Sequence, residues 1–409
     1  MVSTTSHEAP VPLEPPASPR RWAVLGAFMA TSVVAQMLWI TFSSPLPSCD
    51  VAVFCPSPSN AVLFVNVMAA TYPLAFVVVS LPVGYFVDSR GFRKAVLIGS
   101  GLLAVSGLLR AFSPNFVALL VFQGVGAVGQ PFILNSISKM VRTWFPESEV
   151  ATATGLGTLS IYIGLAIGLG ATQAVDGALG VRNMLLVYGA VAALAFVLFI
   201  VFGHERKAGS SPEETPSFRE VVGILRVRNI AILSALFFVG IGIFNAFASD
   251  LQWMLPARGI PSGLVNPLGG LLIVGGIFGA LTMTVLADRY RTLIRPLWLS
   301  LIAATLLWAV LGVVKGTLPE ALGLLVLGFF FMATLPLALD LSARSVPRSA
   351  EGAANAVVWE FSQIGGFALI FVFSGLGGAP GASTWTLTFF LASGLCAVML
   401  VLGLLLRPP

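Results

Sequence analysis

The chain has 409 residues, of which 57% are hydrophobic and only 10% are charged. Soluble domains carry about 25% charged residues, so this composition excludes a soluble globular protein and indicates a lipid environment. The formal net charge is +5. The basic residues lie in short links between apolar runs, which indicates membrane topology rather than nucleic-acid binding. A β-barrel would show alternating apolar and polar residues, and no such alternation is present.

Residues 1–21 are proline-rich and lack the apolar core and cleavage site of a signal peptide, so we expect a disordered cytoplasmic tail. A bilayer core requires about 20 apolar residues per helix. The apolar runs therefore predict twelve transmembrane helices, at 22–45, 59–87, 93–112, 115–140, 150–174, 182–203, 229–256, 265–287, 294–314, 318–342, 352–375 and 384–406.

The distribution of lysine and arginine predicts the orientation. Sorted by the loops between these helices, 18 basic residues lie on one side and four on the other, namely Arg110, Arg182, Arg258 and Lys315. Cytoplasmic loops carry the basic excess, so both termini are expected in the cytoplasm, with the protein in the inner or plasma membrane.

One long polar stretch, 204–228, divides the chain into an N-terminal bundle at 22–203 and a C-terminal bundle with a short tail at 229–409. Its second half has helical periodicity, which predicts a linker along the inner surface. Asp88 follows the second helix and Asp288 the eighth, 200 residues apart, and Pro146 and Pro347 are separated by 201 residues. This recurrence indicates two repeated six-helix halves.

The segment from Gly84 to Lys94 resembles the signature loop of the major facilitator superfamily, although Ser89 and Phe92 depart from it. The resemblance implies an all-α membrane protein with the major facilitator fold, in which 12 transmembrane helices form two pseudo-symmetric halves. A close helix approach is expected at Gly84, and Asp88 is expected to hold a helix N-terminus or an arginine of the opposite half. The predicted gating residues are Gly84, Asp88, Arg90, Gly91, Arg93, Asp288 and Arg289.

Three acidic residues lie within predicted helices, where a charge costs roughly 3 kcal/mol, so each is a functional candidate. Glu360 lies near the membrane midplane and is a candidate for substrate binding and proton coupling. Asp250, close to the outer end of its helix, is either a second coupling residue or a solvated vestibule residue. Asp340 is four residues from Arg344, a spacing that predicts a structural ion pair.

No lysine or arginine is expected at comparable depth, and an anionic solute would need a buried cation. The sequence therefore predicts a neutral or cationic solute. The histidines are His7 in the tail and His204 in the linker, so we expect no metal site, no cofactor and no enzyme activity. Cys49 and Cys55 share one predicted outer loop, where they form either a disulfide or two free thiols.

Several uncharged polar and aromatic residues lie within the predicted helices. Helices 1, 4, 7 and 11 line the central cavity in the superfamily, and four of these residues fall on them at similar depth. Those four are Trp39, Gln130, Asn245 and Gln363; the others are Gln36, Gln123, Asn135 and Tyr162.

Segments in both halves also resemble the FLVCR family, the feline leukaemia virus subgroup C receptor-related transporters. They include the run from Gln36 to Ile40, the run that begins at Gln130, and Ser362-Gln363-Ile-Gly. The resemblance implies a cavity that holds choline or ethanolamine in an aromatic cage with glutamines, and haem export has also been assigned to the family. The cage residues match Trp39, Gln130 and Gln363, whereas Asn245 replaces a tyrosine and Glu360 a small residue.

We therefore expect a secondary transporter that moves a small polar or cationic solute by alternating access, with the lipid bilayer as its environment. A proton is the candidate coupling ion, and a monomer is expected. The predicted substrate-binding residues are Trp39, Gln130, Asn245, Gln363, Glu360 and Trp359. The alternatives are a proton-coupled multidrug or haem exporter and a receptor or scaffold without transport.

Overall fold

The computed structural model describes residues 18–44, 46, 60–205, 223–346, 351–378 and 383–408. The predicted cysteine pair and most of the tail and linker lie outside these residues. The described elements are all helical. In chain order they are α1 (Arg20–Ile40), η1 (Thr41–Ser43), α2 (Ala61–Arg90), α3 (Phe92–Ala111), α4 (Phe116–Leu134), α5 (Ile137–Trp144), α6 (Glu147–Leu179), α7 (Val181–Phe202), α9 (Arg228–Met254), η3 (Pro256–Arg258), η4 (Ser262–Leu264), α10 (Val265–Arg289), α11 (Ile294–Val313), α12 (Thr317–Phe331), α13 (Thr334–Arg344), α14 (Glu351–Gly377), η6 (Ser383–Thr386) and α15 (Leu387–Leu404).

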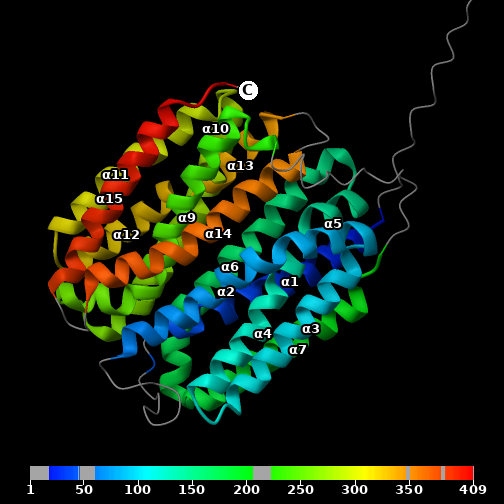
Figure 1. The fold of residues 1–409 in the computed structure, drawn as a ribbon, viewed down its shortest axis with the longest axis horizontal. Helices are drawn as coiled ribbons and strands as arrows, with labels where there is room; N and C mark the ends of the chain where they lie inside the picture. The colour runs from blue at the N-terminus through cyan, green and yellow to red at the C-terminus, as the bar shows by residue number, and fades with distance from the viewer. Residues whose placement is uncertain are drawn as a thin grey trace, which may run out of the picture.

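Within the described residues, 12 helical spans are long and apolar enough to cross a membrane, which confirms the predicted number. Figure 1 shows helices α1 to α7 gathered on one side of the molecule and α9 to α15 on the other. We call these groups the first half and the second half. The end of the bundle at which α1 begins and α15 ends is called the termini end, and the opposite end the far end.

Two predicted helices are each broken into two pieces. The single helix expected over 318–342 ends at Phe331 and resumes at Thr334. Pro336 has no N–H group and cannot donate to the carbonyl group of Met332, so the helical ladder is interrupted there. In the first half, the helix expected over 115–140 breaks at Asn135 and Ser136.

The boundaries of two helices also differ from prediction. The first helix ends at Ile40 rather than at residue 45, because a 3₁₀ turn follows and Pro45 comes after it. It begins at Arg20, so the two arginines assigned to the tail belong to the helix. Arg21 Nε lies 2.9 Å from Glu149 Oε2 and joins the start of α1 to the start of α6.

The two halves approach closely at the far end. A Cβ atom added at Gly170 of α6 would lie 3.9 Å from the Cα atom of Gly270 in α10. Gln173 Nε2 donates a hydrogen bond of 3.1 Å to the carbonyl oxygen of Ser262. Glycine permits this approach because it has no side chain to separate the backbones.

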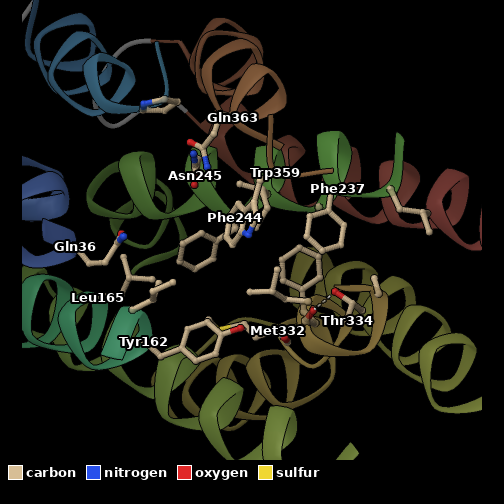
Figure 2. A pocket seen from close by; sticks show the side chains of 18 of the residues that line it. Gln36, Tyr162, Leu165, Phe237, Phe244, Asn245, Met332, Thr334, Trp359 and Gln363 are labelled. Atoms are coloured by element: carbon tan, nitrogen blue, oxygen red, sulfur yellow. Dashed lines mark hydrogen bonds between the residues drawn. The ribbon is translucent and has the colours of Figure 1, made fainter. Parts of the chain in front are cut away.

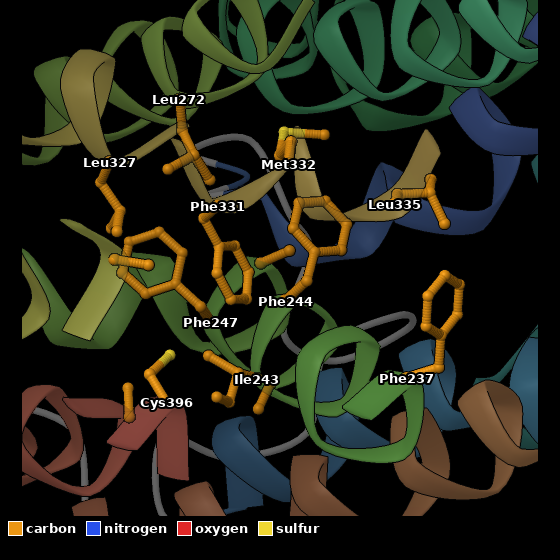
Figure 3. Packing of buried hydrophobic residues seen from close by; sticks show 14 of the residues in the cluster. Phe237, Ile243, Phe244, Phe247, Leu272, Leu327, Phe331, Met332, Leu335 and Cys396 are labelled. Atoms are coloured by element: carbon orange, nitrogen blue, oxygen red, sulfur yellow. The ribbon is translucent and has the colours of Figure 1, made fainter. Parts of the chain in front are cut away.

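Aromatic packing fixes α9 within the second half. Figure 3 shows Phe237, Phe244 and Phe247 along this helix, with Phe247 and Phe331 among the buried apolar residues. The ring of Phe247 lies edge-on to the fully buried Trp308, with their centroids 5.0 Å apart. Such edge-to-face pairs contribute roughly 1 kcal/mol beyond burial. This packing fixes the orientation of α9, whose Phe244 and Asn245 line the cavity described below.

Candidate functional site

A cavity lies between the two halves, near the middle of the bundle, and is shown in Figure 2. About 940 Å³ of space not filled by protein atoms lies within it, a figure that includes open solvent at its mouth. Its lining includes Leu297 in the first turn of α11, Ala338 of α13 and Met399 of α15. These positions show that the cavity extends toward the termini end.

Aromatic side chains from both halves line this cavity. Trp39 of α1 is 6% exposed, and its Nε1 donates a hydrogen bond of 2.9 Å to the carbonyl oxygen of Ala69 in α2, which fixes the indole. In the second half, the rings of Trp359 and Phe237 lie edge to face, with centroids 6.4 Å apart. Phe244 also faces the cavity (Figure 2). Several aromatic faces are therefore available to one bound solute.

A hydrogen bond at the cavity links the halves through the break in the tenth span. Tyr162 Oη of α6 lies 3.5 Å from the carbonyl oxygen of Met332. Pro336 has no N–H group to donate to this carbonyl oxygen, and Leu335 N donates to it instead at 3.3 Å. Both Tyr162 and Met332 line the cavity (Figure 2). The break thus supplies a backbone acceptor at the cavity wall.

The polar side chains of the cavity are mainly amides. Figure 2 shows Asn245 and Gln363 close together on neighbouring helices. Asn245 packs against Gly366 of α14, where an added Cβ would overlap the amide nitrogen. Among the described lining residues there is no lysine, arginine, histidine, aspartate or glutamate. The four lining amides are Gln36, Gln130, Asn245 and Gln363.

Glu360 is not among the described lining residues, although it was predicted to bind the solute. Trp359 and Gln363 are four residues apart and share one helical face, whereas the next residue after Trp359 points about 100° away. Glu360 faces Ser80 of α2 instead. The structure thus places this carboxyl group at the contact between α2 and α14, beside the cavity.

Gln123 and Asn135 do not line the cavity either. Gln123 Oε1 accepts a hydrogen bond of 2.8 Å from Arg110 Nη1, and Asn135 Nδ2 donates one of 3.1 Å to the carbonyl oxygen of Ser80. Both side chains therefore join helices within the first half.

Two arginines expected in outer loops are buried. Arg110 belongs to the last turn of α3 and is 0% exposed. Arg258 in η3 is paired with Glu320, and both side chains are 0% exposed. Both lie at the ends of helices, where internal acceptors replace water around their guanidinium groups. Neither lines the cavity.

The described contacts of the gating segment lie within the first half. Arg93 N donates a hydrogen bond of 2.9 Å to Glu205 Oε2 at the end of α7. Gly91 has φ +88°, a backbone conformation that favours glycine. An added Cβ atom would lie 2.6 Å from Glu205 Oε1, the flexible end of a side chain. The close approach expected at Gly84 is not made, since an added Cβ would meet nothing within 4 Å. The side chain of Asp88 lies outside the described part, and Arg90 is exposed.

The corresponding charges of the second half lie together at the termini end. Arg344 Nε lies 2.7 Å from Asp340 Oδ1 on the same face of α13. Asp288 of α10 is close enough to attract Arg344, and Arg289 is exposed. Asp250, by contrast, is fully buried near the far end in this conformation, where solvent does not reach it.

Several cavity residues were not predicted from the sequence. They include Tyr72, Phe237, Phe244 and Met332. Most residues of a membrane helix are apolar or aromatic, so the residue type alone does not distinguish a cavity position from a core or lipid-facing position. Phe237 and Phe244 are seven residues apart, two helical turns, which places them on one face. That spacing was the signal available for finding them.

Comparisons with known proteins agree with this architecture. The family model of the Major Facilitator Superfamily matches residues 28–370. Solute carrier family 49 member A3 of Danio rerio is 25% identical over 93% of this chain and 85% of its own. The human choline/ethanolamine transporter FLVCR2 is 23% identical, covering 87% and 72% of the two chains.

A solved structure shows the same fold. It is a bacterial homologue of the human lysosomal transporter Spinster in an inward-facing and occupied conformation. It superposes with a TM-score of 0.69 at 13% identity, over 95% of this chain and 97% of that one. The superfamily consists of transporters, so this chain is a multi-pass membrane transporter of small molecules and not an enzyme. The chain belongs to the Major Facilitator Superfamily.

Proposed function

We propose that this transporter moves a small polar or cationic solute of the choline, ethanolamine or amine class. The observation that carries the proposal is the cavity itself, in which Trp39 and Trp359 combine with four amides and no charged side chain is described in the lining. A desolvated quaternary ammonium gains up to about 2 kcal/mol from each aromatic face. The name of the human FLVCR2 relative supports the same class.

Asn245 stands where the FLVCR resemblance implies a tyrosine, but the cage does not depend on that position. Phe237 and Phe244 of the same helix also line the cavity. They supply the aromatic faces that the tyrosine would have given, while Asn245 and Gln363 can accept hydrogen bonds from a hydroxyl or an amine. Choline and ethanolamine both carry such a hydroxyl group.

Transport is proposed to proceed by alternating access between the two halves. The far end is closed by contacts such as Gly170 with Gly270, while the cavity extends toward the termini end. The basic excess on one side supports a cytoplasmic location of both termini, and we propose an inner or plasma membrane. The structure then corresponds to an inward-facing state, and the outward-facing state requires the far end to open.

Glu360 is the proposed proton-coupling residue beside this cavity. It faces Ser80 across the contact between α14 and α2, two helices of opposite halves, so its charge can bias how the halves meet. A Glu360→Gln variant is expected to abolish stimulation of uptake by a pH gradient while retaining solute binding. Equal stimulation of both proteins would show that another group carries the proton.

Thermal-shift measurements on the purified full chain test the solute class. Choline and ethanolamine are expected to stabilise the protein according to their affinity, whereas haem and amino acids are not. Trp39→Ala is expected to weaken choline binding about 30-fold, the equivalent of about 2 kcal/mol. Trp22→Ala is the matched control, because Trp22 is 43% exposed at the start of α1, away from the cavity.

Gln363→Ala tests the same site a second time, because it removes the one or two hydrogen bonds that the amide would make with the solute. We expect about a tenfold loss of affinity for choline. Choline binding that is unchanged in both Trp39→Ala and Gln363→Ala would place the solute elsewhere. Stabilisation by haem and not by the amines would favour the haem exporter.

A further inference from the structure

Asp250 carries a buried carboxyl group that does not line the cavity. It lies in the last turns of α9, near the far end, and is 0% exposed. Neither of its carboxyl oxygens has a hydrogen-bond partner among the described residues. It is also absent from the described cavity lining. A carboxyl group in such a position demands a separate explanation.

The side chain that faces Asp250 belongs to the other half. Asn66 of α2 lies beside the carboxyl group and is 1% exposed. Neither its amide oxygen nor its amide nitrogen makes a hydrogen bond of ordinary geometry with any described residue. Two unpartnered polar groups therefore meet across the closed far-end contact, and η1 packs against both of their helices.

No described charged group balances Asp250. On the elements that pack against α9, the charges are already paired or lie elsewhere. Arg258 of η3 pairs with Glu320, and Arg110 of the first half bonds to Leu38 and Gln123. Glu360 of α14 faces Ser80. The remaining charges on α2, α10, α13 and after α15 belong to the termini end: Asp88, Arg90, Asp288, Arg289, Asp340, Arg344 and Arg407.

An ionised carboxylate held this way would cost several kcal/mol, because no described cation lies beside it and the amide nitrogen of Asn66 makes no hydrogen bond of ordinary geometry with it. A protonated carboxyl group needs only one acceptor, and the amide oxygen of Asn66 can supply it. We propose that Asp250 and Asn66 form a proton-binding site that is occupied when the far end is closed. This inference uses the alternating-access motion proposed above but is independent of the solute.

The site converts proton binding into closure. When the halves part at the far end, water reaches Asp250, and the proton leaves its carboxyl oxygen for a water molecule. The resulting carboxylate is stabilised by hydration and opposes reclosure until it is protonated again. Proton binding and far-end closure therefore favour each other, as linkage requires.

Spin-label distances across the far end test this site in the full chain without solute. The labels are placed at Asn183 of α7 and Lys315 after α11, which are exposed and belong to opposite halves. The three native cysteines are replaced, and the protein is reconstituted in lipid nanodiscs. We expect the open population to rise with pH in the otherwise unchanged chain and to stay low at every pH in Asp250→Asn, which mimics the protonated form.

Asn66→Ala is the second variant, and it keeps the proposal testable if Asp250→Asn does not fold. Loss of the Asn66 amide removes the side chain that faces the carboxyl group, so the pH midpoint of opening is expected to shift by about one unit, the value of one hydrogen bond. An unchanged midpoint would show that Asn66 takes no part in the site. Asp340→Asn is the matched control, because it removes a carboxylate at the termini end that is 37% exposed, and it should leave the far-end midpoint unchanged.

Three results would overturn the proposal. They are a far-end distance insensitive to pH in the wild-type chain, an unchanged pH response in Asp250→Asn, and a response that follows sodium concentration at fixed pH. Because no solute is present, these outcomes leave the solute assignment untouched. Conversely, a failure of choline to bind affects the cavity alone.

Discussion

The two halves of the molecule each bury an arginine near the far end, and they balance its charge in different ways. In the second half, Arg258 forms a closed pair with Glu320: Nε lies 3.2 Å from Oε1, and Nη2 lies 3.2 Å from Oε2. Its guanidinium also lies 4.6 Å from the ring centre of Phe389. The pair ties η3 to the start of α12.

In the first half, Arg110 has no described carboxylate beside it. Its Nη1 donates to Leu38 O at 3.0 Å and to Gln123 Oε1 at 2.8 Å, whereas Nε and Nη2 have no described partner. Tyr72, which lines the cavity, lies close enough to interact with its charge. This half therefore keeps an incompletely compensated cation behind the cavity wall.

The difference shows that repeated halves need not repeat their polar interiors. A paired charge adds little net stability relative to apolar packing, but removing one partner of a buried pair is severe. A buried charge without a counter-charge, such as that of Arg110, has no such pair to break, so its removal should cost less. The second half should accordingly be the more sensitive of the two to a single charge change.

The largest expected effect is at Glu320. Glu320→Gln would leave the charge of Arg258 buried without a counter-charge, at a cost of about 3–5 kcal/mol. The measurement is unfolding of the detergent-solubilised protein by heat and by denaturant. Replacing both residues together, with Arg258→Met and Glu320→Leu, should restore much of the loss. Equal destabilisation of the single and double variants would mean that the pair is not coupled.

A smaller effect is expected at Arg110. Arg110→Met removes a charge that lacks a carboxylate and deprives two acceptors of their donor, at a cost of about 1–2 kcal/mol. The same unfolding measurements apply. A loss as large as that of Glu320→Gln would indicate a counter-charge for Arg110 and would erase the contrast between the halves.

The smallest effect is expected at Asp340 and Arg344, whose side chains are 37% and 54% exposed. Asp340→Asn should change stability by less than about 1 kcal/mol, since solvent screens an exposed ion pair. The variant serves as a reference for charge removal at the surface. A loss above that value would show that the neighbouring Asp288 and Arg344 belong to a structural network.

Much of the site could be predicted from the sequence, and the misses have a common cause. Trp39, Gln130, Asn245 and Gln363 stand out as polar or amphipathic residues at membrane depth, and the structure brings all four to one cavity. Glu360 stands out equally but faces α2, because one residue along a helix changes its direction by about 100°.

Local sequence determined the number of spans, since each apolar run of about 20 residues must cross the bilayer as a helix whatever its neighbours are. Only the tertiary structure decided which charges are buried. Whether Arg258 meets Glu320, or Asp250 meets Asn66, depends on helices far apart in the chain, and the cost of a buried charge is set by those neighbours.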